Sequence, residues 1–231
     1  MIVSHKHKFI FIKTAKTAGT SIEIALSKIC GPKDIITPIS PDDEKYRKNL
    51  GFRTKQNFYI PISKYSKKDI LFALYRRKRL KFYNHMGAEQ IRRYIDDKHW
   101  NSYFKFAFER NPYDRLVSAY WFFGGDKRFS SIENFTKSVM AAKLSIWGFE
   151  SYTQNSKVVV DEVYKYEELN EAMIDISKKI GLKHPLELPK KKARGNFRKD
   201  KRHYRNILLE TEKKWVEKVC AREIAFWGYR Y

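Results

Sequence analysis

The stretch IKTAKTAGTS, residues 12–21, joins two segments with different hydrophobic patterns. The run before it, Phe9–Ile12, is short, bulky and apolar, which is typical of a buried strand. After it, apolar residues recur at helical spacing on one face: Ile22, Ala25, Leu26 and Ile29. We therefore predict a strand, a polar loop and a helix over about 20–29. Free backbone N–H groups and the positive end of the helix dipole suit such a loop to an anion.

The same alternation recurs along the chain. Strand-like runs at 103–108 and 157–163 are each followed by a helical pattern, at about 113–123 and about 168–180, and further helices are predicted at about 87–96 and about 210–226. This order predicts an α/β fold with a central parallel sheet flanked by helices. We expect a single domain over 1–231, with a basic, less regular insertion at 31–84 and a basic C-terminal loop at 184–206.

Composition narrows the class of partner. The 231 residues include 48 basic and 26 acidic ones, a net charge of +22 that predicts an acidic partner. Charge alone leaves nucleic acid, anionic glycan, anionic lipid and nucleotide open. The two cysteines, Cys30 and Cys220, have no metal-binding spacing and are read as reduced. We expect a cytoplasmic protein, because we find neither a leader peptide nor an apolar stretch long enough to cross a bilayer.

The loop differs from the common phosphate-binding motifs. If Lys16 were the lysine of a Walker A loop, the two glycine positions would hold Ile10 and Ala15. A dinucleotide fingerprint fails as well, because Gly19 is the only glycine of the stretch. An alternative is a plain polar turn in which Thr20 or Ser21 caps the helix.

A second motif, FKFAFERNPYDRLVSAYWFF at 104–123, combines a strand with a helix. The strand ends at Arg110, and Ser118 lies eight residues further on, within the helix. An arginine fork and a hydroxyl in these positions can hold one phosphate between them. The alternative is that Arg110 pairs with Asp114 while Ser118 only packs.

These motifs resemble those of sulfotransferases that use 3′-phosphoadenosine 5′-phosphosulfate (PAPS), particularly the Golgi-type carbohydrate sulfotransferases. KTAKTAGTS resembles the loop that holds the 5′-phosphosulfate, and RNPYDRLVSAY resembles the pair that holds the 3′-phosphate. VYKYEEL, at 163–169, is similar to the segment near the adenine, and the basic stretch from Leu188 with the terminal FWGY resembles the family's C-terminal loop and last helix. The resemblance covers about 1–30 and 85–231, and it implies a P-loop-kinase-like sulfotransferase fold.

The resemblance also implies roles for individual residues. Lys16 would stabilise the charge on the transferring sulfuryl group and the leaving phosphate, and Lys13 is a second candidate. PAPS would be the donor, 3′-phosphoadenosine 5′-phosphate (PAP) the product, and no metal is required. Thr14-Ala15 departs from the His or Phe and Pro that often precede the lysine. The remaining nucleotide contacts would come from Thr17, Ala18, Gly19, Thr20, Ser21, Arg110, Ser118, Tyr166, Arg194 and Gly195.

The acceptor side is less well defined. His85 precedes a predicted helix where related enzymes often carry a histidine base, and an imidazole with a pKa near 6.5 suits removal of a hydroxyl proton. Glu89, one turn later, is a rival base or an orienting partner. The basic runs 75–85 and 189–205 flank these positions and are predicted to border one cleft, which favours an anionic glycan or glycolipid acceptor.

Two other functions remain as alternatives. Lys16-Thr17 together with VVVD at 158–161 imitates a nucleotide kinase with a magnesium aspartate on a strand. A noncatalytic nucleic-acid binder would use the basic loops and tyrosines, although without a nucleotide pocket. The missing glycines oppose the kinase, and nucleic acid is considered an unlikely partner.

Overall fold

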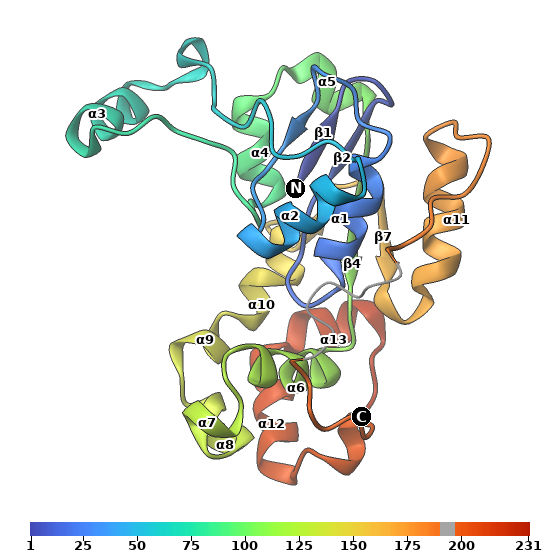
Figure 1. Ribbon diagram of the computed structural model, residues 1–231. Helices are drawn as coiled ribbons and strands as arrows, with labels where there is room; N and C mark the ends of the chain where they lie inside the picture. Colours follow the sequence, from blue (N-terminus) through green and yellow to red (C-terminus); the bar gives the residue numbers. More distant parts are fainter. Residues whose placement is uncertain (190–196) are drawn as a thin grey trace.

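The computed structural model describes residues 1–189 and 197–231, and its centre is a mixed sheet (Figure 1). The five-stranded sheet has the order β3-β1-β2-β4-β7. Its strands are β1 (Ile2–Ser4), β2 (Phe9–Phe11), β3 (Ile35–Ile36), β4 (Phe104–Glu109) and β7 (Glu162–Lys165). A separate hairpin contains β5 (Thr153–Gln154) and β6 (Lys157–Val158).

The predicted parallel sheet is confirmed for three strands and wrong for a fourth. β2, β4 and β7 run parallel, whereas β1 is antiparallel to both of its neighbours. The reason is the short connection between Ser4 and Phe9, because only an antiparallel pair can be joined by so few residues. The strand predicted at 157–163 is also divided, since β6 belongs to the hairpin and β7 begins only at Glu162.

Helices cover both faces of the sheet and form a second, all-helical layer beside it (Figure 1). Those predicted from periodicity are α1 (Gly19–Ser27), α4 (Ala88–Tyr94), α6 (Pro112–Phe122) and α11 (Leu169–Lys179). The last predicted helix is broken at Cys220 into α12 (Glu210–Val219) and α13 (Ala221–Trp227). The others are α2 (Pro41–Asn49), α3 (Lys67–Arg76), α5 (Asp97–Ser102), α7 (Asp126–Phe129), α8 (Ile132–Thr136), α9 (Val139–Ala142) and α10 (Leu144–Trp147).

Alternating side chains give the sheet two apolar faces. Ile10 and Ala107 point to the face that α4 covers, while Phe11 and Phe106 point to the face covered by α1 and α11. A third cluster joins α6 to α8 and α12. α6 therefore connects the sheet layer to the helical layer.

The carboxyl ends of β2, β4 and β7 lie at one edge of the sheet because these strands are parallel. The residues that follow them are the loop 12–18, Arg110 and Tyr166. In open α/β sheets this edge is where ligands bind. The fold thus brings together the segments that the sequence motifs singled out.

The basic insertion at 31–84 contributes β3 to the sheet edge and then α2 to the body. Its helix α3 projects away from the rest of the molecule (Figure 1). Of the helices that the structure describes, none is long and apolar enough to span a bilayer.

Candidate functional site

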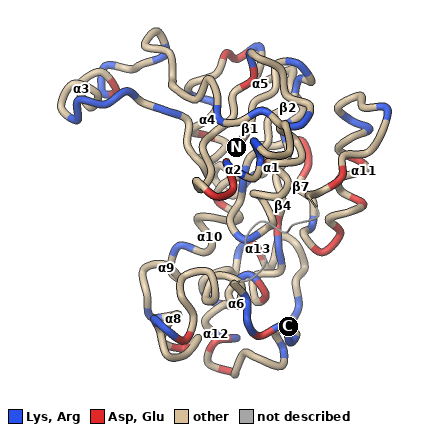
Figure 2. The backbone as a smooth tube through the Cα atoms, in the orientation of Figure 1, with Lys and Arg blue, Asp and Glu red and all other residues tan. Residues whose placement is uncertain are grey.

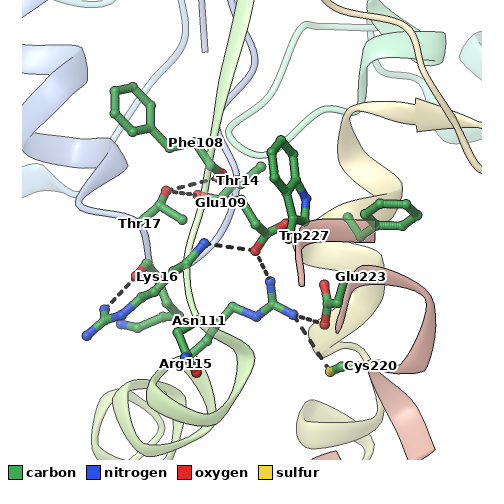
Figure 3. Close-up of polar contacts among 12 residues, drawn as sticks. Thr14, Lys16, Thr17, Phe108, Glu109, Asn111, Arg115, Cys220, Glu223 and Trp227 are labelled. Atoms are coloured by element: carbon green, nitrogen blue, oxygen red, sulfur yellow. Dashed lines mark hydrogen bonds and ion pairs between the residues drawn. The ribbon is translucent and has the colours of Figure 1, made fainter. Parts of the chain in front are cut away.

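The loop after β2 is held by its threonines. Thr14 donates its hydroxyl hydrogen to the carbonyl of Phe108 at 2.5 Å, and its oxygen lies 2.9 Å from the hydroxyl of Thr17 (Figure 3). Both contacts are buried, so the loop is fastened to β4 although it lacks the glycines of a Walker A motif. Lys16 and Ala18 adopt left-handed backbone conformations with φ of 66° and 56°.

Helix α1 begins at Gly19, with Ala18 at the N-cap position. The alternative in which Thr20 or Ser21 caps the helix is therefore wrong. Within the described parts of the chain, the backbone N–H groups of Gly19, Thr20 and Ser21 donate no hydrogen bond. The first turn also contains no acidic residue. These donors and the helix dipole are available for an anion.

Lys13 is a structural residue. Its ammonium group is buried and lies 2.7 Å from Glu23, which also pairs with the amino terminus at 3.2 Å. Burial alone would raise the pKa of Glu23, but the two cations lower it below its ordinary value. A Cβ on Gly19 would lie 2.7 Å from Cγ of Lys13, so this glycine makes room for the lysine stem.

Lys16 lies at the interface between the loop and α6. Its ammonium nitrogen is 3.9 Å from the ring centroid of Phe122, and its carbonyl accepts a hydrogen bond from Arg110 at 2.6 Å. The side chain is half-buried. Lys16 thus stands beside the start of α1 and the last residue of α6.

One face of α6 is directed at this loop. Asn111 caps the helix by accepting from the N–H groups of Tyr113 and Asp114. Asp114, Ser118 and Phe122 follow at intervals of four residues, so they share a face. The hydroxyl of half-buried Ser118 makes no hydrogen bond to any described residue, whereas Asp114 pairs with Arg110 and Phe122 contacts Lys16.

Arg110 forms the ion pair that the sequence left as an alternative. Its Nε and Nη2 atoms donate to one oxygen of Asp114 at 2.9 and 2.5 Å, and its guanidinium lies 4.2 Å from the ring centroid of Tyr166. Together with the bond to Lys16, these contacts use three of the five N–H donors of a guanidinium. Arg110 is therefore fixed in place, and two of its N–H donors are not used in these contacts.

The basic C-terminal loop reaches the same place. Arg198 donates to the second oxygen of Asp114 at 2.7 Å, and the ring of Phe197 lies 5.7 Å from that of Phe122. Burial opposes ionisation of Asp114, yet the two arginines hold its pKa below the ordinary value. Asp114 was predicted only as the alternative partner of Arg110, and Phe122 and Arg198 were not predicted as site residues. The four-residue spacing was a signal for Asp114 and Phe122. Arg194 and Gly195 lie outside the described residues.

His85 is near the loop, but with different acid–base properties from those predicted. Its Nδ1 lies 3.0 Å from the carbonyl of Lys13, so Nδ1 carries the hydrogen and Nε2 the lone pair. Burial, and then the charges of Lys13 and the amino terminus, lower its pKa to about 3. The pKa near 6.5 that we predicted is therefore wrong for the free protein.

Glu89 lies elsewhere. Its exposed carboxylate is 3.1 Å from Arg93 on the next turn of α4. It borders a polar cavity of about 560 Å³ whose other lining residues include Lys64, Arg92, Arg93, Asp96 and Gln154. This cavity lies between α4, α5 and the β5–β6 hairpin rather than at the loop after β2.

A buried ionic network supports the site from behind. Arg115 bridges Glu109 at 2.5 Å and Glu223 (Figure 3). Tyr152 donates to the other oxygen of Glu109 at 2.6 Å. A Cβ on Gly148 would lie 2.1 Å from Arg115, so only glycine fits there. This network fixes the last residue of β4, the neighbour of Arg110, to α6 and α13.

The features expected for a kinase do not assemble. Asp161 pairs with Lys105 at 2.9 Å, at the end of β4 remote from Arg110. The described residues contain no group of three or more metal-ligating side chains.

The two basic runs that were predicted to border one cleft lie apart. Arg76 and its neighbours lie on the projecting arm, while 197–205 lies beside α6 (Figure 2). Among the described residues of the two runs, none shows them bordering a single cleft.

Comparison with known proteins gives the family. No solved structure matches this chain. An uncharacterized protein of Archaeoglobus fulgidus is 37% identical over 111 residues, which are 45% of this chain and 88% of that protein. The sulfotransferase family matches over residues 1–226, a span that includes the loop after β2, Arg110, Ser118 and Tyr166. This chain therefore belongs to the sulfotransferase family, which is PAPS-dependent and includes carbohydrate sulfotransferases.

Proposed function

We propose that this protein transfers a sulfuryl group from PAPS to a hydroxyl group of a carbohydrate, in a P-loop-kinase-like sulfotransferase fold. One observation carries the proposal. Lys16, Arg110 and Arg198, from three distant segments, meet beside the start of α1. Its first turn contains no acidic residue, and the N–H groups at 19–21 donate to no described residue. These groups suit an anion such as a phosphosulfate.

Lys16 and the start of α1 would act on the transferring group. The acceptor oxygen forms a bond to sulfur as the bond from sulfur to the phosphate oxygen breaks, and negative charge develops on that leaving oxygen. A fixed ammonium and fixed N–H groups favour this charge more in a half-buried site than in water. The contacts of Thr14 with Phe108 and Thr17 would hold the loop rigid, so that its donors stay in the positions that suit the transition state rather than shifting to fit the bound substrate.

Arg110, Ser118 and Arg198 would hold the 3′-phosphate. Asp114 orients both arginines. Ser118 lies one turn further along the same helix face, between Asp114 and Phe122. The ring of Tyr166, already stacked on Arg110, is the candidate contact for the adenine. The identity of the donor thus depends on the α6 face, and the chemistry depends on the loop.

His85 is our candidate for the base that takes the acceptor proton. Its hydrogen bond to Lys13 directs the hydrogen to Nδ1 and leaves the Nε2 lone pair available. The pKa of about 3 belongs to a protein without donor. An anionic donor beside the imidazole would raise this pKa, because negative charge favours the imidazolium. Glu89 is the weaker candidate because Arg93 holds it on the outer side of α4.

The acceptor is proposed from the family and the charge. Carbohydrate sulfotransferases are members of the family, and the net charge of +22 favours an anionic glycan or glycolipid. Incubation with PAPS and a panel of neutral and acidic glycans, followed by mass spectrometry, tests the proposal. We expect glycans that gain one sulfuryl group each, at a rate about 10²-fold or more lower with Lys16→Ala. Transfer from magnesium ATP, with none from PAPS, would contradict it.

A further inference from the structure

The projecting arm, residues 58–82, has a surface that the proposed reaction does not use. Its two ends are joined by backbone hydrogen bonds, from Phe82 N–H to Phe58 C=O at 2.8 Å and from Ile60 N–H to Leu80 C=O at 3.0 Å, and α3 lies between them. No residue of α3 is buried. The arm nevertheless contains the apolar run Ile70–Tyr75, which would be expected to lie in a core.

The orientation of α3 is fixed by its one acidic residue. Asp69 completes a capping box with Ser66 and accepts a hydrogen bond from Tyr94 of α4 at 3.1 Å, so this side of the helix faces the body. Leu71, Leu74 and Tyr75 lie roughly 140–240° around the helix from Asp69, on the opposite side. Their exposed fractions, 67, 69 and 85%, exceed the 44% of Ile70 and the 50% of Phe72, as this orientation requires.

Basic side chains surround this apolar face. Between residues 58 and 82 there are eight lysines and arginines, and Asp69 is the only acidic residue. Aromatic rings accompany the arginines: Arg79 lies 5.0 Å from the ring centroid of Tyr59, and Arg76 lies near Phe72 and Tyr75. Figure 2 shows the blue segments of the arm on both sides of α3.

This chemistry distinguishes between kinds of partner. A protein interface is depleted of lysine, and a nucleic acid has no use for aliphatic side chains such as Leu71 and Leu74. A lipid surface with anionic headgroups takes both parts, because the apolar face enters the acyl boundary while lysine and arginine remain with the headgroups. We infer that the arm docks this protein on an anionic membrane surface, with α3 lying in the interface.

Vesicle sedimentation of the full chain tests this inference. We expect binding to vesicles that contain phosphatidylglycerol, at least about tenfold weaker binding to pure phosphatidylcholine, and further weakening by salt. Replacement of the outer apolar face, by Leu71→Ser, Leu74→Ser and Tyr75→Ser together, should weaken binding about tenfold or more. PAP affinity should not change, since these residues are remote from the nucleotide site.

A matched variant controls for general loss of exposed apolar surface. Val139→Ser, Ile146→Ser and Leu209→Ser together remove residues that are 70, 50 and 68% exposed outside the arm, and vesicle binding should be retained. Insertion is read directly with an environment-sensitive dye on Leu74→Cys, because the native Cys30 and Cys220 are buried. The dye emission should shift to the blue with anionic vesicles, and a dye on Val139→Cys should not respond.

Three results would overturn the inference. One is equal binding of the parent chain and the apolar-face variant to anionic vesicles, which would leave only nonspecific charge attraction. Another is an unchanged dye spectrum at position 74 when the protein sediments with vesicles. The third is a parent chain that is dimeric in solution while the apolar-face variant is monomeric, since the arm would then bind a second copy. None of these outcomes depends on the proposed transfer reaction.

Discussion

Lys13 and Lys16 are three residues apart in the sequence and have different environments. Lys13 is buried against Glu23 and closes the contact between the loop and α1. Lys16 is half-buried beside Phe122, at the start of the helix. The apolar alternation of β2 continues through Ile12 and sends the next side chain inward, which is why the first lysine is structural. We therefore propose that the second lysine acts on the ligand.

Lys16→Ala should reduce sulfuryl transfer much more than PAP affinity. The ammonium is needed most where charge develops, so the turnover number should fall by about 10² or more. Steady-state rates with PAPS and calorimetric titration of PAP check the two quantities. Lys28→Ala, at the exposed end of the same helix, is the control and should change neither. Unchanged turnover of Lys16→Ala would remove the residue from the mechanism.

His85 should make the fold sensitive to acid. Its pKa is lowered to about 3 in the folded chain, while an unfolded histidine titrates near 6.5. Below about pH 6.5 the unfolded state binds a proton at this residue and the folded state does not. The contribution of neutral His85 to the free energy of unfolding is therefore complete above pH 6.5 and is lost as the pH falls toward 3.

His85→Asn removes the titrating group and suits the φ of 64° at this position. Urea unfolding at pH 7 and pH 5 measures the result. The loss of unfolding free energy between the two pH values should be smaller in the variant than in the parent chain. An equal loss in both proteins would mean that the imidazole is protonated in the folded state.

At the scale of elements, the unit that matters is β4 followed by α6. Its register brings Arg110 to the edge of the sheet, and the four-residue spacing sets Asp114, Ser118 and Phe122 on one helix face. Arg198 closes the unit from the C-terminal loop. The nucleotide specificity that we propose is a property of this arrangement.

Ser118→Ala should weaken PAP binding by about 1 kcal/mol and hardly change the affinity for adenosine 5′-phosphosulfate, which lacks the 3′-phosphate. This substitution breaks no hydrogen bond to a described residue, so the loss reports on the ligand. Arg110→Ala should cost more, about 2–3 kcal/mol for a charge-assisted contact. Competitive titration of both nucleotides checks the pair. Equal weakening of the two ligands would refute the assignment of the 3′-phosphate.

Gly148→Ala should destabilise the layer behind the site. The added methyl group would meet buried Arg115 at 2.1 Å, and Arg115 cannot move without breaking its contacts to Glu109 and Glu223. We expect a loss of about 1–3 kcal/mol in the free energy of unfolding. Gly87→Ala, whose Cβ would meet nothing closer than 3.5 Å, is the matched control. Equal effects of the two substitutions in urea unfolding would mean that Arg115 is free to shift.

The local sequence pattern was sufficient to predict the strand–loop–helix units, because β2 and α1, like β4 and α6, lie in one continuous stretch of sequence. It was insufficient where a distant segment decides the outcome. The docking of Arg198 on Asp114 depends on the path of the C-terminal loop, and the pKa of His85 depends on Lys13 and the amino terminus beside it. The break at Cys220 turns α13 so that Glu223 reaches Arg115. Such contacts have no signature in periodicity.

Across the whole molecule, two regions have separate chemistry. The carboxyl edge of the sheet gathers cations and helix N–H groups, where we propose a nucleotide site, and the arm has the apolar and basic side chains that we propose dock on a membrane. The arm ends at Phe82, three residues before His85. Docking of the arm would therefore set the position of the proposed base relative to a membrane.

The most direct test of the central claim is calorimetric titration of the parent chain with PAP, ATP and an oligonucleotide, each with and without magnesium. The proposed site predicts that PAP binds one to one, without any requirement for magnesium, and more tightly than ATP or the oligonucleotide. The same titration with Ser118→Ala should show weaker PAP binding. Magnesium-dependent binding of ATP without binding of PAP, or binding of the oligonucleotide alone, would contradict the account.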